Sequence, residues 1–413
     1  MSAPIGYLVP EFPSQTHTFF WREICALRAR GADVRLFSTR RPPPEACRHP
    51  FAAEAARETR YLVPPGAGRM ASWLARRPGS LGPALDYVRG LQSDGFRGYL
   101  KHRGILACAL GLAEAARREG ISHVHSHSCA DAAHLLAISR RAGGPSYSLT
   151  LHGDLPVYGR DHREKMRDAA FVSAVGGHLR RQILEETGLD DRRVWVTCMG
   201  IETERYAALG ASRSSAAGSL HLVTVARLNR VKGHEHAIAA LKRAVDAGVD
   251  LRYTIAGEGE HRPVLEARIQ ELGLGERVRL VGTLGEDEVA RLLDSADAFV
   301  LASTGLGEAW PVSVMEAMAT GMPVVVSIIG ATPEMITSGE DGLLIPQGDR
   351  EALAAAFTSL ARDPALRRRL GENGRRRARE QFDVRGTAGR LLDAIRSAQD
   401  EATQSQRSTA SSG

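Results

Sequence analysis

Two glutamates, Glu308 and Glu316, lie eight residues apart in the stretch GLGEAWPVSVMEAMATGMPVV, which covers residues 305–325. The stretch predicts a loop, a helix that begins at Pro311, and a short buried strand over 323–327, because proline suits the first position of a helix. Glu308 then precedes a helix N-terminus and Glu316 lies within the helix. Spacing alone favours a plainer interpretation, in which one acid is solvated in a loop and the other lies on a polar helix face.

Two cationic side chains follow a predicted strand earlier in the chain. The segment VARLNRVKG places Arg227 and Lys232 after the strand, at the start of a helix. Cations beside a helix N-terminus favour a phosphate, because the free N–H groups and the helix dipole both attract an anion. Taken alone, the two residues are equally compatible with ordinary surface charges.

Glycine-containing turns follow the next two predicted strands. AGEGE contains Gly257 and Gly259, which allow close backbone approach, and VGTLGEDE follows the strand after that. All these turns fall at the carboxyl ends of predicted parallel strands, the edge where ligands bind in open α/β sheets. Their common position makes a phosphate site the better interpretation of the two cations.

Strand-like and helical runs alternate along the whole chain, which implies parallel sheets covered by helices on both faces. Small and polar residues over 209–219 interrupt the alternation and indicate a linker, after which the pattern restarts. At 413 residues the chain is too long for one ordinary core. We therefore expect an α/β fold with two doubly wound Rossmann-like domains, over 1–205 and 206–383, and a disordered polar tail over 398–413.

The composition, 43% hydrophobic and 25% charged, is typical of a globular protein in water, and no apolar run reaches the roughly 18 residues that span a bilayer. The N-terminus lacks the basic stretch of a signal peptide. The five cysteines are scattered without paired metal-ligand spacing. We expect reduced thiols and a cytoplasmic location, with peripheral contact to the inner face of the cell membrane as an open possibility.

Charge is unevenly distributed between the two halves. Residues 1–205 carry a net charge of +8, whereas residues 206–413 carry −2. A basic first half indicates an anionic partner on that side. Nucleic acid is not the expected partner, because the basic residues are not interleaved with aromatic ones and no recognition motif is present.

Five segments carry a resemblance to a known family. VARLNRVKG, AGEGE, VGTLGEDEVARLLDSADAFVLAS, GEAWPVSVMEAMATGMPVVVS and GATPEMITSGEDGLLIPQGD occur in this order. They resemble the C-terminal half of retaining GT-B glycosyltransferases of the large bacterial family with the E-x7-E motif, glycosyltransferase family 4, of the exopolysaccharide type. The first half is less similar, through YLVPEFPSQTHTFFWREI, HVHSH, LTLHGD and VTCMGIETERY.

The resemblance implies two domains that face each other across a cleft. The domain over 1–205 is expected to bind the acceptor and the one over 206–383 the nucleotide-sugar. A C-terminal helix over 384–397 is expected to pack back on the N-terminal domain. The reaction implied is transfer of a hexosyl group from a nucleotide-sugar, with a UDP-sugar as the expected donor, to a glycan, a lipid-linked glycan or a small-molecule acceptor. No cofactor is expected, since the nucleotide-sugar is a substrate.

The two acids of the motif are implied to bind opposite ends of the donor. Glu316 accepts hydrogen bonds from the ribose hydroxyls and Glu308 faces the sugar; eight helical residues rise about 12 Å, and the helical phase returns to nearly the same side. Arg227 and Lys232 flank the diphosphate. The remaining donor-side residues are Gly257, the base-contacting Gly282, Thr283 and Leu284, and the backbone of Ala309, Trp310, Pro311 and Val312.

No Asp-x-Asp motif occupies a suitable strand end, so no metal site is expected. The two cations and the helix dipole would stabilise the charge that develops on the departing nucleoside diphosphate. No carboxylate is evident for a covalent intermediate. The resemblance implies front-side displacement through an oxocarbenium-like ion pair, with retention of configuration and the leaving phosphate as the base.

The first half supplies candidate acceptor-side residues. His152, at the end of the predicted strand SYSLTL, matches the family histidine near the donor sugar; an ordinary structural histidine is the alternative. His125 and His127 point to one face of a strand, because side chains alternate along it. A zinc pair is an open interpretation without an evident third ligand, and a role in lining the cleft is favoured for His127.

The segment PEFPSQTHTFF departs from the glycine-rich turn of many relatives. Ser14 and Thr16 are candidates to donate a hydrogen bond to the diphosphate or acceptor, or to cap the following helix. Asp154 in HGDLPVYG is displaced relative to the commoner His-Gly-x-Asp pattern, so its assignment to the site is weak.

Two alternatives to an active transferase remain open. One is a catalytically silent nucleotide-sugar-binding scaffold, which would have no need of Arg227, Lys232, Glu308, Glu316 and His152 together. The other is a phosphorylase, although no lysine lies in a context that suggests a PLP-dependent enzyme.

Residues 69–103 combine seven basic residues with interspersed aromatic and apolar ones, including Trp73, Tyr87, Phe96 and Tyr99. Such a segment can dock at an anionic membrane surface, because the rings enter the interface while the cations meet the headgroups. An ordinary solvated helix pair is the alternative.

Overall fold

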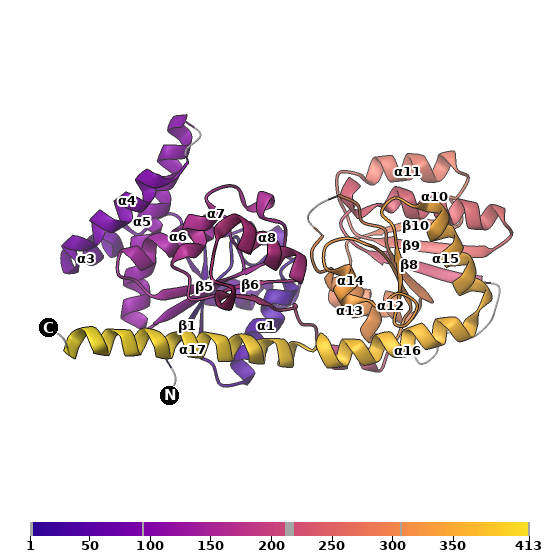
Figure 1. Cartoon of the computed structure of the whole chain (residues 1–413). Helices are drawn as coiled ribbons and strands as arrows, with labels where there is room; N and C mark the ends of the chain where they lie inside the picture. Colours follow the sequence, from indigo (N-terminus) through magenta and orange to yellow (C-terminus); the bar gives the residue numbers. More distant parts are fainter. Residues whose placement is uncertain (1–2, 93–94, 211–218, 306–307, 412–413) are drawn as a thin grey trace. The chain divides into compact units, whose positions relative to one another are not determined.

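The computed structural model describes residues 3–92, 95–210, 219–305 and 308–411, and it divides into two compact units (Figure 1). Unit 1 comprises Met1–Thr197 and Arg385–Gly413, and unit 2 comprises Cys198–Val384. Most of the predicted linker, residues 211–218, lies outside the described residues.

Unit 1 is built on a parallel sheet with the strand order β3-β2-β1-β4-β5-β6-β7. The strands are β1 (Ile5–Leu8), β2 (Val34–Ser38), β3 (Arg60–Tyr61), β4 (His123–Ser126), β5 (Ser146–Leu151), β6 (Val172–Ala174) and β7 (Val194–Val196). The helices are α1 (Thr18–Ala29), α2 (Ala52–Glu58), α3 (Ala67–Arg76), α4 (Leu81–Gly90), α5 (Gly95–Glu119), α6 (Asp131–Arg141), α7 (His162–Arg167), α8 (Gly177–Thr187) and α17 (Val384–Ser411).

Unit 2 repeats the same plan, with the strand order β10-β9-β8-β11-β12-β13. Its strands are β8 (Ser219–Val225), β9 (Asp250–Ala256), β10 (Val278–Gly282), β11 (Ala298–Leu301), β12 (Val324–Ser327) and β13 (Leu343–Ile345). Its helices are α9 (Thr203–Ala207), α10 (His234–Asp246), α11 (Arg262–Glu271), α12 (Glu286–Asp294), α13 (Val312–Ala319), α14 (Thr332–Met335), α15 (Arg350–Arg362) and α16 (Pro364–Gln381). The expected fold, two Rossmann-like α/β domains with parallel sheets, is confirmed.

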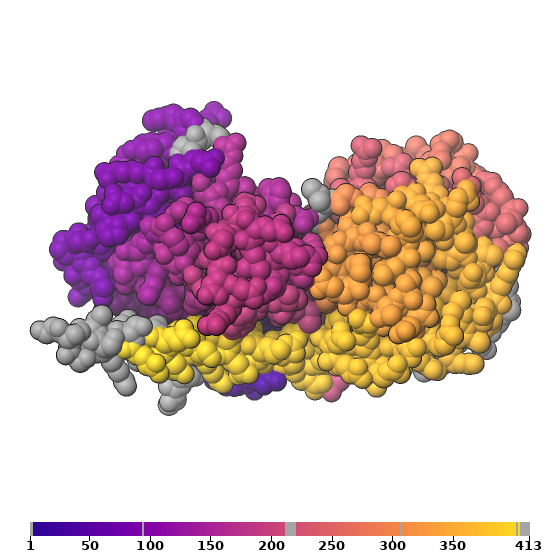
Figure 2. Space-filling view, viewed as in Figure 1, coloured from indigo at the N-terminus to yellow at the C-terminus, as the bar shows by residue number. Residues whose placement is uncertain are grey.

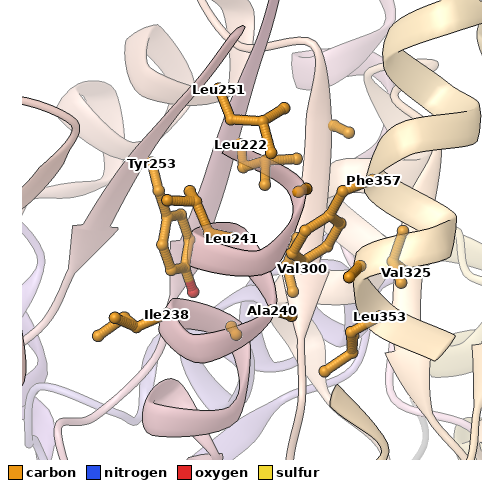
Figure 3. Close-up of a cluster of buried hydrophobic side chains, with 14 of the residues drawn as sticks. Leu222, Ile238, Ala240, Leu241, Leu251, Tyr253, Val300, Val325, Leu353 and Phe357 are labelled. Atoms are coloured by element: carbon orange, nitrogen blue, oxygen red, sulfur yellow. The ribbon is translucent and has the colours of Figure 1, made fainter. Parts of the chain in front are cut away.

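The sheet of unit 2 is covered on one face by α10 and α15. Leu222, Leu251 and Val300 of the strands pack against Leu241 of α10 and Phe357 of α15 (Figure 3). Strands that are buried in this way carry near-continuous apolar runs, as VVV in β12 does. This core fixes the strands, and hence the positions of the loops at their carboxyl ends.

In both sheets the strand order reverses beside the first strand of the unit. β1 has β2 on one side and β4 on the other, and β8 has β9 and β11. Loops that leave such a pair of strands turn to opposite sides of the sheet and open a crevice at its carboxyl edge. The loops after β8 and β11, and those after β1 and β4, are therefore the places where a site is expected.

The units divide at 197/198, earlier than the expected boundary at 205/206. The N–H of Ile201 donates to the carbonyl of Phe382 (2.8 Å), and Thr203 Oγ1 donates to Asp383 (2.5 Å). These contacts attach the segment after β7 to unit 2.

Helix α17 extends beyond the expected end at residue 397, through most of the segment predicted to be a disordered tail. Arg30 of α1 donates to the carbonyl of Arg385, and Gln399 donates to Ser122 Oγ (3.0 Å), so α17 is attached to unit 1 near both points. The segment AQDEATQSQR continues the helix because it contains good helix formers and no proline or glycine.

Candidate functional site

The carboxyl edge of the unit 2 sheet brings Lys232 and Glu308 together. Lys232 ends the short turn after β8, and Glu308 lies in the loop between β11 and α13. Lys232 Nζ forms an ion pair with Glu308 Oε2, which also accepts a hydrogen bond from Ser303 Oγ (3.1 Å). The side chains of Lys232 and Glu308 are 18% and 11% exposed. Lys232 was expected beside the diphosphate and Glu308 beside the sugar of a donor, but in this structure the two side chains contact each other directly.

Arg227 differs from Lys232 in its surroundings. Its side chain is exposed, and within the described residues the guanidinium has no hydrogen-bond or ion-pair partner. Its carbonyl accepts a hydrogen bond from His234 Nε2 (3.0 Å), which ties the loop to the start of α10. Arg227 is thus a charged group on a fixed backbone with its donors available to an anion.

The glycines of these loops allow segments of the chain itself to approach one another. A Cβ on Gly233 would lie 1.8 Å from the carbonyl oxygen of Ala302, and one on Gly257 would lie 1.9 Å from that of Ala226. Both glycines have positive φ angles, 65° and 147°. Gly257 is therefore required for the close approach of the backbone after β9 to the backbone after β8.

The predicted base-contacting segment lies next to the Gly257 loop. Gly282 ends β10, and its carbonyl accepts a hydrogen bond from the N–H of Gly257 (2.8 Å). Thr283 is exposed and Leu284 is half-buried. The loops after β8, β9 and β10 thus form one row along the edge of the sheet.

Glu316 lies inside α13 and is 8% exposed, so it does not lie on a solvated helix face. Its Oε1 accepts a hydrogen bond from the hydroxyl of Tyr206 (2.9 Å), which belongs to α9 and is itself buried. The sequence analysis missed Tyr206. A buried carboxylate requires donors, but its partner lies 110 residues away in the sequence, and spacing within one helix does not reveal it.

The loop before α13 presents its backbone and buries its side chains. Trp310 packs its ring against Phe382 at 5.8 Å, and its indole N–H points to Met315 Sδ (3.1 Å). Pro311 is the N-cap of α13 rather than its first helical residue, and it has no N–H. The carbonyl of Ala309 accepts from the N–H of Ala331 (3.0 Å). The N–H groups of the first turn, beginning at Val312, have no partner within the helix, as at any helix start.

In unit 1, His127 and His152 meet at the carboxyl edge of the sheet. His127 Nδ1 lies 2.8 Å from His152 Nε2, and His127 Nε2 lies 2.8 Å from Glu23 Oε1. Glu23, in α1, was not identified from the sequence. Burial lowers the pKa of both histidines to about 3, so both imidazoles are neutral near pH 7.

His125 lies deeper in the same sheet. Its Nδ1 and Nε2 face the hydroxyls of Ser148 (2.8 Å) and Thr150 (3.1 Å) in β5. Its side chain is buried, with both nitrogens satisfied by protein groups. Among the described residues, no group of three or more His, Cys, Asp or Glu side chains is placed to hold a metal ion.

Ser14 and Thr16 do not cap the following helix, which corrects one of the two expectations for them. The N-cap of α1 is His17, without a side-chain capping bond. Ser14 is half-buried and Thr16 is exposed in the loop between β1 and α1. Asp154 lies 3.8 Å from His178 Nε2.

Comparison with known proteins gives two matches along the chain. Residues 17–205 match the family described as Glycosyltransferase Family 4, and residues 212–377 match the one described as Glycosyl transferases group 1. The chain is 38% identical over 182 residues to the amylovoran biosynthesis glycosyltransferase AmsK of Erwinia amylovora; the match covers 43% of this chain and 44% of AmsK. Curated relatives such as AmsK are thus matched over less than half of their length.

A longer match, at lower identity, is to the N-acetyl-alpha-D-glucosaminyl L-malate synthase of Bacillus anthracis. It is 27% identical over 296 residues, which cover 67% of this chain and 75% of that protein. Among solved structures, Anabaena HepE in complex with UDP-glucose has a TM-score of 0.70 at 17% identity, and covers 96% of this chain and 100% of its own. This likeness concerns the fold. The chain is thus similar to the Glycosyltransferase Family 4 model over its first half and to the Glycosyl transferases group 1 model over its second half, and it shares the GT-B fold of HepE.

Proposed function

We propose that the protein is a retaining glycosyltransferase, which moves a sugar from a nucleotide-sugar to a glycan, a lipid-linked glycan or a small-molecule acceptor. The observation that carries the proposal is the pair of largely buried acids Glu308 and Glu316, each held by a donor, Lys232 and Tyr206, from elsewhere in unit 2. Buried carboxylates at the carboxyl edge of a sheet offer acceptors to the hydroxyls of a ligand.

The two acids would bind opposite ends of the nucleotide-sugar donor. Glu316 would accept from the ribose hydroxyls in addition to the hydrogen bond that its Oε1 accepts from Tyr206. Glu308 would face the sugar. A UDP-sugar is favoured because HepE, which shares the fold, was solved in complex with UDP-glucose. AmsK and its relatives act, by their names, in polysaccharide biosynthesis, which supports a glycan or lipid-linked acceptor.

The diphosphate would lie between the acids, near Arg227, Lys232 and the first turn of α13. When the glycosidic bond breaks, negative charge develops on the leaving diphosphate. Positive groups already in place stabilise that charge in the transition state, and one such contact is worth about 2.7–4 kcal/mol. Donor binding would draw Lys232 from Glu308 toward the phosphate and leave the carboxylate for the sugar. Arg227 and Lys232 thus take the place of a metal ion.

Retention would follow from front-side attack. The acceptor hydroxyl would approach from the side of the leaving phosphate, which takes its proton, through a short-lived oxocarbenium-like ion pair. This route needs no protein carboxylate beneath the anomeric carbon.

A donor screen tests the proposed reaction. The full chain is incubated with UDP-, GDP- and ADP-sugars and with glycan acceptors, and nucleotide release and product are followed by mass spectrometry. We expect release from a UDP-sugar, unchanged by EDTA, and a product with the donor's anomeric configuration. Lys232→Ala should lower kcat at least 100-fold, whereas Lys242→Ala, whose ion pair with Asp246 lies at the other end of α10, should leave it unchanged.

Three results of the screen would contradict the proposal. Complete loss of activity in EDTA with recovery in manganese would exclude metal-independent transfer. A product of inverted configuration would exclude retention. Binding of a nucleotide-sugar without transfer to any acceptor would favour the silent scaffold instead.

The Tyr206→Phe variant tests whether the tyrosine hydroxyl holds Glu316 in place for the ligand. Removing the hydroxyl takes one hydrogen bond from the Glu316 carboxylate, so affinity for the nucleoside diphosphate should fall about tenfold, the effect of one hydrogen bond to a charged group. Tyr253→Phe is the matched control, because Tyr253 is also buried and its hydroxyl bonds Thr224 in the core (2.6 Å). Equal affinities in both variants, measured by calorimetry, would show that Tyr206 serves only stability.

We propose that the protein contacts the membrane surface through the first turns of α5. Phe96 is 74% exposed, and Tyr99 and Leu100 are also exposed. They lie beside Arg97 and Lys101 in the first turns of α5, a helix that is drawn in purple in Figures 1 and 2. Cations around exposed apolar side chains suit an anionic lipid surface.

The structure corrects the expected membrane anchor. Trp73 and Tyr87 are buried in unit 1, so they are not available to a membrane. Among the described residues, no helix is long and apolar enough to cross a bilayer. The proposed contact is therefore limited to a surface patch, defined by the exposed residues Phe96, Arg97, Tyr99, Leu100 and Lys101.

Vesicle co-sedimentation tests this patch. The full chain should bind vesicles that contain anionic lipid at low salt and dissociate as salt screens the cations. Phe96→Ser combined with Leu100→Ser should reduce binding at least tenfold, since each exposed apolar side chain contributes about 1.5–3 kcal/mol when buried. Val264→Ser, at an exposed position of α11 in unit 2, should have no effect. Absence of binding at low salt would leave a soluble acceptor as the better interpretation.

A further inference from the structure

Four buried or half-buried side chains of unit 1 form a continuous hydrogen-bonded chain. The hydroxyl of Tyr7, in β1, donates to Glu23 Oε1 (2.7 Å), and the same oxygen lies 2.8 Å from His127 Nε2. His127 Nδ1 in turn lies 2.8 Å from His152 Nε2. The chain therefore runs from β1 through α1 to the ends of β4 and β5, along the carboxyl edge of the sheet.

The direction of each hydrogen bond follows from the chemistry of its groups. A carboxylate oxygen that already accepts from Tyr7 also accepts from His127, so His127 carries its proton on Nε2. In a neutral imidazole the other nitrogen is then a bare acceptor, so His127 Nδ1 accepts from His152 Nε2–H. His152 is left with its proton on Nε2 and a lone pair on Nδ1.

The orientation of the His152 ring is fixed by its neighbours. The ring stacks on His127 with centroids 5.1 Å apart, and Phe19 and Phe20 meet it edge to face at 5.3 and 5.8 Å. Its backbone N–H donates to the hydroxyl of Tyr158 (2.9 Å). A 180° flip of the ring, which exchanges Nε2 with Cε1 and Nδ1 with Cδ2, would break the contact to His127.

Nδ1 of His152 is a buried nitrogen without a hydrogen-bond partner among the described residues. Buried polar atoms are normally paired, and an orphaned one at the carboxyl edge of a parallel sheet points to a ligand. The ligand atom must be a donor, because the chain of hydrogen bonds leaves Nδ1 without a proton. A sugar offers hydroxyl donors in abundance.

We propose that Glu23 and His127 are positioning residues that hold His152 in the tautomer with its proton on Nε2, so that Nδ1 accepts a hydrogen bond from a hydroxyl of the bound sugar. The proposal rests on the proposed function for its ligand, but the tautomer itself does not depend on any activity. It assigns a role to Glu23, which the sequence analysis did not single out, and gives His127 a function through His152.

The tautomers are measured directly by two-bond ¹H–¹⁵N correlation spectra of the full chain labelled with ¹⁵N-histidine. His127→Gln and His152→Gln variants assign the signals. We expect both residues to be neutral at pH 7, with a protonated Nε2 and a bare Nδ1. A His152 signal with the proton on Nδ1, or a charged imidazole, would overturn the proposal whether or not a donor has been found.

Glu23→Gln tests the origin of the tautomer. The amide can present an N–H to His127 Nε2 and reverse the direction of the chain, so His152 should shift toward the form protonated on Nδ1. In that form Nδ1 cannot accept from the sugar, and kcat/KM should fall about tenfold. Glu114→Gln is the matched control. Glu114 is a buried carboxylate of the same unit, held by Arg117 and Arg118.

Glu114→Gln should lower stability while leaving the His152 signals and kcat/KM unchanged. If Glu23→Gln keeps the wild-type tautomer of His152 and also loses activity, Glu23 acts in some other way and the positioning role is excluded. If the tautomer shifts but kcat/KM is unaffected, His152 Nδ1 does not contact the sugar.

Discussion

A carboxylate that is withdrawn from water must find hydrogen-bond donors in the protein, and this requirement organises the candidate donor site. Glu308 is held by Lys232 and Ser303, and Glu316 by Tyr206. Each acid keeps acceptor capacity beyond these bonds, because a carboxylate has about four lone-pair positions. In the proposed function, these donors hold the acids in place for a ligand that carries hydroxyls and a diphosphate. The strand-order reversal beside β8 is what brings the Lys232 and Glu308 loops to neighbouring positions.

Unit 1 meets the same requirement with neutral groups. Below His127 and His152, the buried His123 and His125 are paired with hydroxyls of Ser146, Ser148 and Thr150 across β4 and β5. Such pairs satisfy polar atoms inside the sheet and favour the uncharged histidine. The chain of partners ends at His152 Nδ1, at the edge of the sheet. One unit therefore offers charges and backbone N–H groups, which suit phosphate, and the other offers a neutral acceptor, which suits a sugar hydroxyl.

The sequence carries information about local structure, and this is what it predicted well. Apolar runs such as VVVS identified the strands, and their alternation with helices identified parallel sheets in two Rossmann-like units. It also indicated residues that the structure places at sheet edges, among them Lys232 and Glu308 in direct contact. The sequence did not show which residues, distant along the chain, contact each other in the fold. Tyr206 and Glu23 act on residues that are about 100 positions away, and no spacing rule connects them.

Two other expectations, the membrane anchor that included Trp73 and the cap of α1, differ from the structure for a similar reason. An amphipathic helix that buries Trp73 in a protein core has the same pattern as one that places it in a membrane interface, so aromatic residues near arginines did not distinguish the two. Ser14 and Thr16 are acceptable N-cap residues by type, yet the chain enters α1 with His17 at the cap. In each case the sequence pattern is local, whereas contacts with neighbouring elements determine whether the residue is buried or where the helix begins.

The most direct test of the donor site is calorimetric titration of UDP into the full chain and into its Glu316→Ala and Glu308→Ala variants. Glu316→Ala should weaken UDP binding at least tenfold, because UDP carries the ribose that this acid would hold. Glu308→Ala should bind UDP as tightly as the unaltered protein or more tightly, because Lys232 is then released to the diphosphate, while transfer becomes slower. Unchanged affinity and turnover in both variants, or equal loss of UDP affinity in both, would contradict the assignment of the two acids to opposite ends of the donor.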